Sequence, residues 1–461
     1  MKKLLFFAVF LCAVILHAGE KLPKYIILFI GDGMATPQRM IAEEFGLKSG
    51  YGKLAINHLP YHATTRTVSA NSLVTDSAAA GTAIACGAKT VNGRIGLDPA
   101  GKRLESVAEV AKKKNYKVGI VSTMVINHAT PASFYGHRSS RNQYYDLGLD
   151  LIDSNFDFFA GGGINHSTGK KNAKDAKAAK PAKPAEAAKP AEAAKPSLYD
   201  LAAKKGYKTL KKKQDFLALK PGCGKVIYSV ASGAMPAAMD TTAEGTTLEE
   251  LTVKALELLK NPKGFFLMVE GGTIDSFGHA NEAAANLHEV LALDKAVKAA
   301  LEFQKKHPEE TLIVITGDHE TGGMTMGFAG SGYAMYVERL ALQKGTANKF
   351  RHVLKEVKPK TFADVQKHLT GYFGFKFTGN IKEDPMVLTP QQIQILEEGF
   401  KKGNLHNAAK LVMSQKAGIG WTTGSHTALP VLTTSIGVQG ERFTGFIDNT
   451  DIAKKLKELI R

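Results

Sequence analysis

The sequence predicts an α/β fold: an α/β/α sandwich around a central, mostly parallel sheet, with a helical lid inserted late in the chain. Four short, unbroken apolar runs predict parallel strands that are buried on both faces. Each run is followed by polar or charged residues, which is unusual for a strand in a protein core. The 461 residues, 44% of them apolar, are enough for one large core, so we expect one elaborated domain.

The four apolar runs, in chain order, are Tyr25 to Ile30, Val118 to Thr123, Phe265 to Val269 and Leu312 to Thr316. The polar residues that follow them are, in the same order, Asp32, the pair Asn127 and His128, Glu270, and the pair Asp318 and His319. Ligands of open α/β sheets bind outside the carboxyl ends of the strands. We therefore expect these side chains to converge.

The third run begins the segment GFFLMVEGGTIDSFGH, from Gly264 to His279, which passes within a few residues from a buried strand to charged groups. Asp275 and His279 are four residues apart, so on a helical turn they share a face and can bind one cation. The segment predicts a metal site at the carboxyl edge of the sheet.

The N-terminus has the pattern of a secretory signal peptide over residues 1–18: two lysines, an apolar run from Leu4 to Leu16, then small and polar residues. An uncleaved anchor is the alternative. The run is too short to span a bilayer. We expect a periplasmic or secreted protein that has no membrane contact after the signal is removed.

Cysteine content limits the kind of metal site that is possible. Of three cysteines, Cys12 lies in the leader, and Cys86 and Cys223 either pair or stay free. A buried free thiol is the preferred interpretation for Cys86, which lies in an Ala-rich helical segment. No CxxC motif occurs, so any zinc must be bound by histidines and carboxylates.

The formal net charge is +17, and part of it is local. Residues 170–196 form a Lys/Ala/Pro repeat with few apolar residues, which predicts a disordered surface insertion. The remaining positive charge would steer anionic substrates toward the protein, but it does not by itself indicate a nucleic-acid partner.

The segment from Asn71 to Cys86, NSLVTDSAAAGTAIAC, predicts a helix that begins near Ser77. Free backbone N–H groups and the helix dipole favour an anion at that position. Ser77 is thus a candidate nucleophile toward phosphate, and a simple N-cap is the alternative. Metal ions nearby would be needed to activate its hydroxyl, because neither a GxSxG elbow nor a Ser-His-Asp pattern is evident.

Two further polar residues lie beside predicted elements. Arg141 follows a short helical stretch and has the fork geometry that binds two phosphate oxygens; a surface arginine is the alternative. Residues 330–424 predict a mostly helical excursion that would form a lid, in which Thr389 is an expected N-cap. The chain then returns through His426, a candidate third ligand beside Asp275 and His279, to a strand from Pro430 to Ser435.

Taken together, the motifs resemble those of the alkaline phosphatase family, in the family's order. They are FIGDGM, DSAAAGTA, HATPA with a following HxxxR, VEGGTID with a later His, GDHETGG and GSHT. The resemblance covers nearly the whole mature chain except the Lys/Ala/Pro insertion and most of the lid. It implies a catalytic domain of residues 19–329 and 425–461, with a lid or crown of residues 330–424.

The resemblance also implies a metal-dependent phosphomonoesterase with two Zn²⁺ and one Mg²⁺. One zinc would be held by Asp275, His279 and His426, and the second by Asp32, Asp318 and His319. The magnesium would be held by Asp32, Thr130 and Glu270, whose hard oxygen ligands suit that ion. Ser77 would attack phosphorus, Arg141 would clamp the phosphate oxygens, and water would then cleave the phosphoserine, with an alkaline optimum.

Two positions depart from some bacterial members, which have Asp where this chain has His128 and Lys where it has Ser276. His128 would either bind the third metal, directly or through water, or serve a structural role beside Thr130. Binding by His128 would make zinc or cobalt possible at that site.

The alternative functions are a phosphodiesterase of the same superfamily and a secreted phosphate-binding protein without turnover. Thr130 and Glu270 argue against the diesterase because those enzymes resemble this chain only at the two-zinc centre. An intact Ser77 argues against loss of catalysis, and no CxPxR-like motif supports a sulfatase. Small phosphate monoesters are the expected substrates. A homodimer is possible because dimers are common in the family.

Overall fold

The computed structural model describes residues 21–169 and 195–461. The predicted signal peptide and nearly all of the predicted Lys/Ala/Pro insertion lie outside the described residues. Within the described part, no helix is both long enough and apolar enough to cross a membrane.

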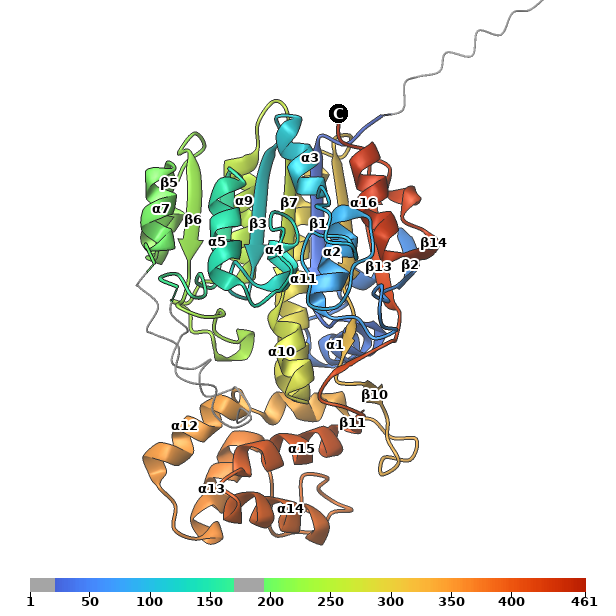
Figure 1. Cartoon of the computed structure of the whole chain (residues 1–461). Coiled ribbons are helices and arrows are strands. Elements are labelled where there is room, and N and C mark those ends of the chain that lie inside the picture. Colours follow the sequence, from blue (N-terminus) through green and yellow to red (C-terminus); the bar gives the residue numbers. More distant parts are fainter. Residues whose placement is uncertain (1–20, 170–194) are drawn as a thin grey trace, which may run out of the picture.

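A ten-stranded sheet in the order β14-β2-β13-β8-β1-β7-β3-β4-β6-β5 forms the centre of the described residues (Figure 1). In chain order these strands are β1 (Tyr25–Gly31), β2 (Tyr61–Arg66), β3 (Lys117–Ser122), β4 (Phe158–Gly161), β5 (Tyr207–Leu210), β6 (Lys225–Ser229), β7 (Phe265–Gly271), β8 (Thr311–Gly317), β13 (Val431–Gly437) and β14 (Gly445–Asp448). Strand β13 pairs antiparallel with both β2 and β8, and the other pairs are parallel. The predicted mostly parallel α/β sheet is therefore confirmed.

The four predicted strands are present as β1, β3, β7 and β8, with ends within two residues of those expected. Strand β7 continues past Val269 and includes Glu270, so this carboxylate lies on the strand itself. The strand expected from Pro430 begins instead at Val431. Proline has no backbone N–H to donate to a ladder, which explains the later start.

Both faces of the sheet are covered by helices, as the unbroken apolar runs require. Alternate residues of β1 enter different clusters: Tyr25, Ile27 and Phe29 belong to one, and their neighbours Ile26, Leu28 and Ile30 to the other. The first face packs against α1 (Thr36–Ser49), α9 (Leu248–Leu259) and α11 (Ala283–Lys306). The second packs against α2 (Ser77–Cys86), α3 (Val107–Lys113), α5 (Tyr144–Asp153), α7 (Leu198–Lys204) and α16 (Asn449–Glu458).

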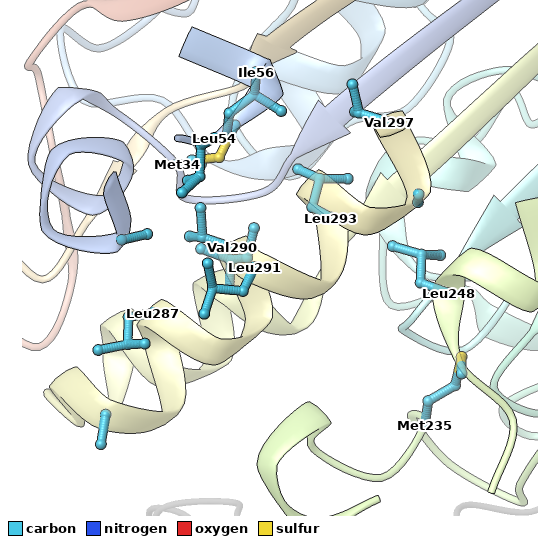
Figure 2. Close-up of a cluster of buried hydrophobic side chains, with 14 of the residues drawn as sticks. Met34, Leu54, Ile56, Met235, Leu248, Leu287, Val290, Leu291, Leu293 and Val297 are labelled. Carbon is cyan, nitrogen blue, oxygen red and sulfur yellow. The ribbon is translucent and has the colours of Figure 1, made fainter. Parts of the chain in front are cut away.

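Helix α11 packs on the first face, and Figure 2 shows its apolar side chains there. Its side chains Leu287, Val290 and Leu293 are fully buried in one cluster with Met34 and Leu54. Burying a leucine or valine side chain contributes about 1.5–3 kcal/mol each. This packing fixes α11, and with it the short helix α10 (Thr273–His279) that precedes it.

The predicted late excursion is mostly helical. It contains η3 (Val337–Leu342), α12 (Ala347–Val357), α13 (Phe362–Phe373), α14 (Pro390–Lys401) and α15 (Leu405–Ala417). Thr389 caps α14, as expected, by accepting a hydrogen bond from Gln392 N. In Figure 1 these helices gather beyond α10, at the end of the sheet where the strands β1, β7 and β8 finish.

The shorter elements connect these layers. They are η1 (Ala55–Asn57), α4 (Ala129–Ala132), α8 (Lys213–Leu217), η2 (Ala238–Asp240) and η4 (Gly440–Arg442), together with two small ribbons, β10 (Met324–Met326) with β11 (Ile419–Trp421) and β9 (Glu320–Thr321) with β12 (His426–Thr427). Cys86 and Cys223 are both free, so the paired alternative is not formed.

Candidate active site

The predicted strand-tip residues converge at the carboxyl edge of the sheet except Asn127, whose side chain instead donates to Tyr144 O and Asn165 O. Three groups of side chains have ligand atoms within 4.8 Å of one another: Asp275 with His279 and His426, Asp32 with Asp318 and His319, and Asp32 with His128 and Glu270. The first two are the zinc sets expected from the resemblance, and the third contains two of the expected magnesium ligands. The strand-tip pattern therefore correctly predicted where these side chains meet.

The first group is built by α10 and by the ribbon strand β12. His279 Nδ1 lies 2.8 Å from Gly424 O, and His426 Nδ1 lies 2.8 Å from Thr75 O. A carbonyl only accepts, so each Nδ1 carries a proton, and a neutral ring presents the lone pair of its Nε2. These two Nε2 atoms are 3.1 Å apart and face Asp275 at 3.3 and 3.4 Å. Two lone pairs and a carboxylate at these distances would repel one another unless protons or a metal cation lie between them.

The second group follows directly from β1 and β8. His319 Nε2 lies 3.4 Å from Asp32 Oδ1 and 3.3 Å from Asp318 Oδ2, and all three side chains are fully buried. The other oxygen of Asp318 accepts hydrogen bonds from Gly33 N at 3.0 Å and His319 N at 2.9 Å. Gly33 has φ 71°, and a Cβ there would lie 2.7 Å from Thr321 Oγ1. Glycine therefore allows the tight turn that places Asp32 in the centre.

The third group lies deeper, between β3 and β7. Thr130 Oγ1 donates to Asp32 Oδ2 at 3.1 Å, and Ser122 Oγ donates to Glu270 Oε2. Glu270 and Thr130 are fully buried. His128 precedes α4, and its Nδ1 is buried without a hydrogen-bond partner among the described residues. Thr130 thus joins the set that was expected around the third metal.

Burial and mutual repulsion dominate the electrostatics of the centre. Burial, reinforced by Asp318, raises the pKa of Asp32 well above its usual range. Burial also raises the pKa of Glu270 to about 7 and that of Asp318 to about 7. At Asp275 burial acts in the same direction but is outweighed by hydrogen bonds from His279 and His426, so its pKa is well below normal. Four carboxylates can be ionised together here only beside compensating positive charge.

The unsatisfied atoms show what kind of charge fits. Within the described residues, Asp32 Oδ1, Asp318 Oδ2 and Glu270 Oε1 are buried without a hydrogen-bond partner. Buried carboxylate oxygens rarely lack partners, because the desolvation cost is large. All three belong to the groups of converging ligands, and imidazole nitrogens with carboxylate oxygens are ligands of divalent ions. The residues therefore fit metal ions.

Ser77 lies at the edge of this centre, at the first position of α2. Its side chain is 1% exposed, and its Oγ is 3.3 Å from His319 Nε2. The N-cap is Asp76, whose side chain accepts a hydrogen bond from Ala79 N, so the N-cap alternative for Ser77 is wrong. With Asp76 as cap, the Ser77 hydroxyl is left free to face the metal-binding groups.

Arg141 lies beside this centre, and contacts with two neighbouring side chains hold its guanidinium group in position. Its Nη1 donates to Asp76 Oδ2 at 3.0 Å, and its Nη2 lies 3.3 Å from His128 Nε2. Burial opposes the charge of Arg141, but Asp76 more than compensates, so the pKa of the guanidinium stays above its usual value. Burial, together with the Arg141 charge, lowers the pKa of His128 to about 3, which keeps this imidazole neutral. The surface-arginine alternative is not what the structure shows.

Sequence reasoning assigned no role to several residues that support this site. Asp76 both caps α2 and holds Arg141, and an N-cap Asp before an Ala-rich helix is a signal that could have identified it. Ser122 binds Glu270, and Thr321 Oγ1 donates to Asp275 Oδ1 at 2.5 Å. Those contacts join distant parts of the chain, so no local sequence pattern indicates them. Ser276 is half-buried beside Met124 and brings no charge to the site.

Comparison with known proteins agrees with this geometry. The family model described as alkaline phosphatase matches residues 23–461. Alkaline phosphatase 3 of Bacillus subtilis (strain 168) is 32% identical over 447 residues, covering 94% of this chain and 88% of that protein. The crystal structure of a cold-active alkaline phosphatase from Shewanella sp. superimposes with TM-score 0.80 at 27% identity, covering 95% of this chain and 100% of that one.

A further solved structure is a His-to-Asp mutant of the alkaline phosphatase of the Antarctic bacterium TAB5, described as having Mg bound in its M3 site. It superimposes with TM-score 0.66 at 26% identity, covering 96% of this chain and 99% of that one. The family match across almost the entire chain, the relatives and the converging metal-binding groups all point to one conclusion. The chain belongs to the alkaline phosphatase family and is a metal-dependent enzyme that hydrolyses phosphate monoesters.

Proposed function

We propose that the enzyme transfers the phosphoryl group of a monoester to Ser77 and then to water, releasing an alcohol and inorganic phosphate. The observation that carries the proposal is the position of Ser77 Oγ, 3.3 Å from His319 Nε2 at the rim of two converging ligand groups. A non-catalytic phosphate binder has no need for a hydroxyl at that position.

We assign the metals from the ligand types. The two sets of imidazole nitrogens and carboxylate oxygens, around Asp275 and around Asp318, suit Zn²⁺. The oxygen set of Asp32, Thr130 and Glu270 suits Mg²⁺. The magnesium in the M3 site of the TAB5 mutant supports a third metal in such enzymes. Since His128 lies within reach of Asp32 and Glu270, it either binds the third ion or holds Arg141, and zinc or cobalt at this site is the alternative.

When bound, the metal ions supply Lewis acidity that favours the ionised serine hydroxyl and stabilises the leaving oxygen. The chain's own groups do the rest. Ser77 Oγ loses its proton and forms a bond to phosphorus as the bond from phosphorus to the alcohol oxygen breaks, and the leaving oxygen takes up a proton. A water oxygen then bonds to phosphorus as the bond from phosphorus to Ser77 Oγ breaks, and one proton of that water returns to Ser77. The first turn of α2 presents backbone N–H groups to the phosphoryl oxygens, and Arg141 adds a fixed positive fork. Both compensate the negative charge of the transition state.

The domain division remains a proposal as well. Residues 19–329 and 425–461 would form the catalytic domain, and residues 330–424 would form a lid. Two contacts support a position of the lid beside the site: the excursion returns through Gly424, whose carbonyl binds His279 Nδ1, and Glu282 Oε1 accepts a hydrogen bond from Ala347 N at the start of α12. The lid would therefore both border the site and orient one of its ligands.

We also propose that the enzyme is exported to the periplasm or secreted, and that the segment of residues 1–18 is removed. The basic, then apolar, then small-residue pattern of that segment supports export. A homodimer stays a prediction from the family resemblance.

The metal-free protein is expected to lose stability as the pH rises from about 4.5 to about 7. Glu270 and Asp318 have pKa values raised to about 7 by burial, so their protons are bound more tightly in the folded state than in the unfolded one. That stabilisation is complete below the unfolded pKa values and is lost as the pH rises through 7. One pKa unit is worth about 1.4 kcal/mol, so we expect a total loss of several kcal/mol.

Urea unfolding across this pH range, with a chelator present, measures the effect. With zinc and magnesium in excess the trend should reverse, because protons compete with the metal ions for the same carboxylates. Equal pH profiles with and without metals would show that these carboxylates do not form the metal centre.

The comparison of monoester with diester hydrolysis tests the proposed function against its rival. Hydrolysis of p-nitrophenyl phosphate should be fast and most rapid at alkaline pH. Hydrolysis of bis-p-nitrophenyl phosphate should be slower by at least about 100-fold, because a second ester group removes the negative charge that Arg141 and the metals bind. Comparable rates for the two substrates would favour the phosphodiesterase, and a single burst of product without turnover would favour the binding protein.

A further inference from the structure

Glu320 is a fully buried carboxylate that belongs to none of the three groups of converging ligands. Its two oxygens accept four hydrogen bonds. Its Oε1 accepts from Gln38 Nε2 at 2.8 Å and from Met324 N at 3.0 Å. Its Oε2 accepts from Gly323 N at 3.0 Å and from the hydroxyl of Thr427. Burying a carboxylate costs several kcal/mol unless its oxygens are well satisfied, and here both are.

The strand register shows what the Glu320 carboxylate connects. In the ribbon of β9 with β12, Glu320 is opposite Thr427, and Thr321 is opposite His426. Side chains alternate along a strand, so Glu320 and Thr427 share one side of the ribbon and Thr321 faces the other. On that other side Thr321 Oγ1 binds Asp275. Each strand thus has one residue on the Glu320 side of the ribbon, Glu320 itself in β9 and Thr427 in β12. The other residue of each strand, Thr321 or His426, lies on the side of the metal-binding groups.

The third segment tied to Glu320 is the start of α1, which follows the β1 turn that contains Asp32. Gln38 Nε2 donates to Thr321 O at 3.1 Å as well as to Glu320, and its Oε1 accepts from Ala35 N at 3.0 Å. Gln38 is fully buried. The position of Glu320 is therefore fixed from α1 and from both strands of the ribbon.

These contacts lie next to two imidazole rings, those of His319 and His426, which belong to different metal-binding groups. His319 directly precedes Glu320, and His426 directly precedes Thr427. The two rings are stacked with centroids 3.6 Å apart, and no hydrogen bond between the rings holds them in the described structure. The hydrogen bond from Thr427 to Glu320 is thus a side-chain link between the segments that carry the two ligands, and it adds to the backbone pairing of β9 with β12.

We propose that Glu320 is a positioning residue for both proposed zinc sites: it holds His319 and His426 at the spacing that binds two ions side by side. The inference rests on the proposed metal centre. It assigns Glu320 no contact with substrate. Partners that orient metal ligands in this way commonly change metal affinity or activity by about 10–100-fold when they are mutated.

The substitution Glu320→Gln tests the role with little change of shape. An amide has one accepting oxygen, and its NH₂ group would face two of the four donors, so half of the hydrogen bonds are lost. Glu43→Gln is the matched control. Glu43 is also buried, 5% exposed, and accepts from Leu54 N at 3.0 Å and Asn57 Nδ2 at 2.9 Å, with His58 on its other oxygen, but it contacts none of the proposed ligands.

The measurement is the rate at which zinc leaves the loaded holoenzyme for a chromogenic chelator, together with zinc content per chain and the unfolding midpoint. We expect Glu320→Gln to release zinc at least about 10-fold faster than the wild type. Glu43→Gln should release zinc at the wild-type rate even where it lowers the midpoint by a similar amount. Activity of Glu320→Gln should recover when free zinc is raised, because added zinc restores the occupancy of the two sites.

Thr427→Val provides a second variant should Glu320→Gln not fold, because it removes one donor and keeps the carboxylate. It should accelerate zinc release in the same direction by a smaller factor. Wild-type release rates in both Glu320→Gln and Thr427→Val, or equally fast release in Glu43→Gln, would overturn the inference while leaving the metal centre intact. A wild-type enzyme that binds no zinc would instead refute the proposed function, and the inference with it.

Discussion

Replacement of Ser77 by alanine is expected to lower kcat/KM for p-nitrophenyl phosphate by at least about 10⁴-fold, because the bond to phosphorus is made by this hydroxyl. Ser77 is buried at the edge of the centre, so replacing its hydroxyl removes the acceptor of the phosphoryl group and leaves the metal ligands in place. The KM value and the zinc content should change little. Steady-state kinetics and metal analysis on the same preparation measure both.

Ser133→Ala is the matched control for this substitution. Ser133 is likewise 1% exposed and packs beside α2, but its hydroxyl donates to Ala129 O at 2.9 Å and faces no metal-binding group. It should keep activity near that of the wild type. If Ser77→Ala retained more than about a tenth of the activity, water rather than serine would be the attacking group.

Removal of the metals is the second change with a large expected effect. Dialysis against a chelator should abolish hydrolysis, and zinc together with magnesium should restore it. The buried carboxylates of Asp32, Glu270 and Asp318 then lack a cation, so stability should fall too. At a free metal concentration a thousandfold above Kd, each bound ion stabilises the fold by about 4 kcal/mol.

The control for metal removal is the same chelator saturated beforehand with zinc, which should leave activity unchanged. Magnesium alone should not restore turnover, because the two nitrogen-containing ligand groups favour zinc. Full activity of a protein shown by elemental analysis to contain no zinc would contradict the account.

Much of the fold could be predicted from the sequence because the decisive signals are local. An apolar run such as Tyr25 to Ile30 cannot alternate between solvent and core, so it indicates a strand with helices on both sides. The end of such a run marks an edge of the sheet, and topology then brings the ends together. Asp275 and His279 needed only helical spacing to be placed on one face.

The completion of each metal group could not be derived from local pattern. His426 lies 147 residues after His279. It was a candidate only because the pair of Asp275 and His279 lacked a third ligand, and the resemblance to a known family supported that choice. The contacts of Thr321 with Asp275 and of Glu320 with Thr427 depend on the register of a two-residue ribbon, which no sequence period is long enough to specify. The role of Asp76 was also missed. Its single carboxylate both caps α2, which is a local contact, and binds Arg141, which is not.

The central claim is that two zinc ions are bound at the strand tips, within reach of the Ser77 hydroxyl. Anomalous diffraction at the zinc edge, from crystals of the enzyme grown with zinc and inorganic phosphate, tests it most directly. The account predicts one zinc peak among Asp275, His279 and His426 and another among Asp32, Asp318 and His319, with phosphate between them and Arg141. Zinc peaks elsewhere on the protein, or none at these two groups, would contradict it.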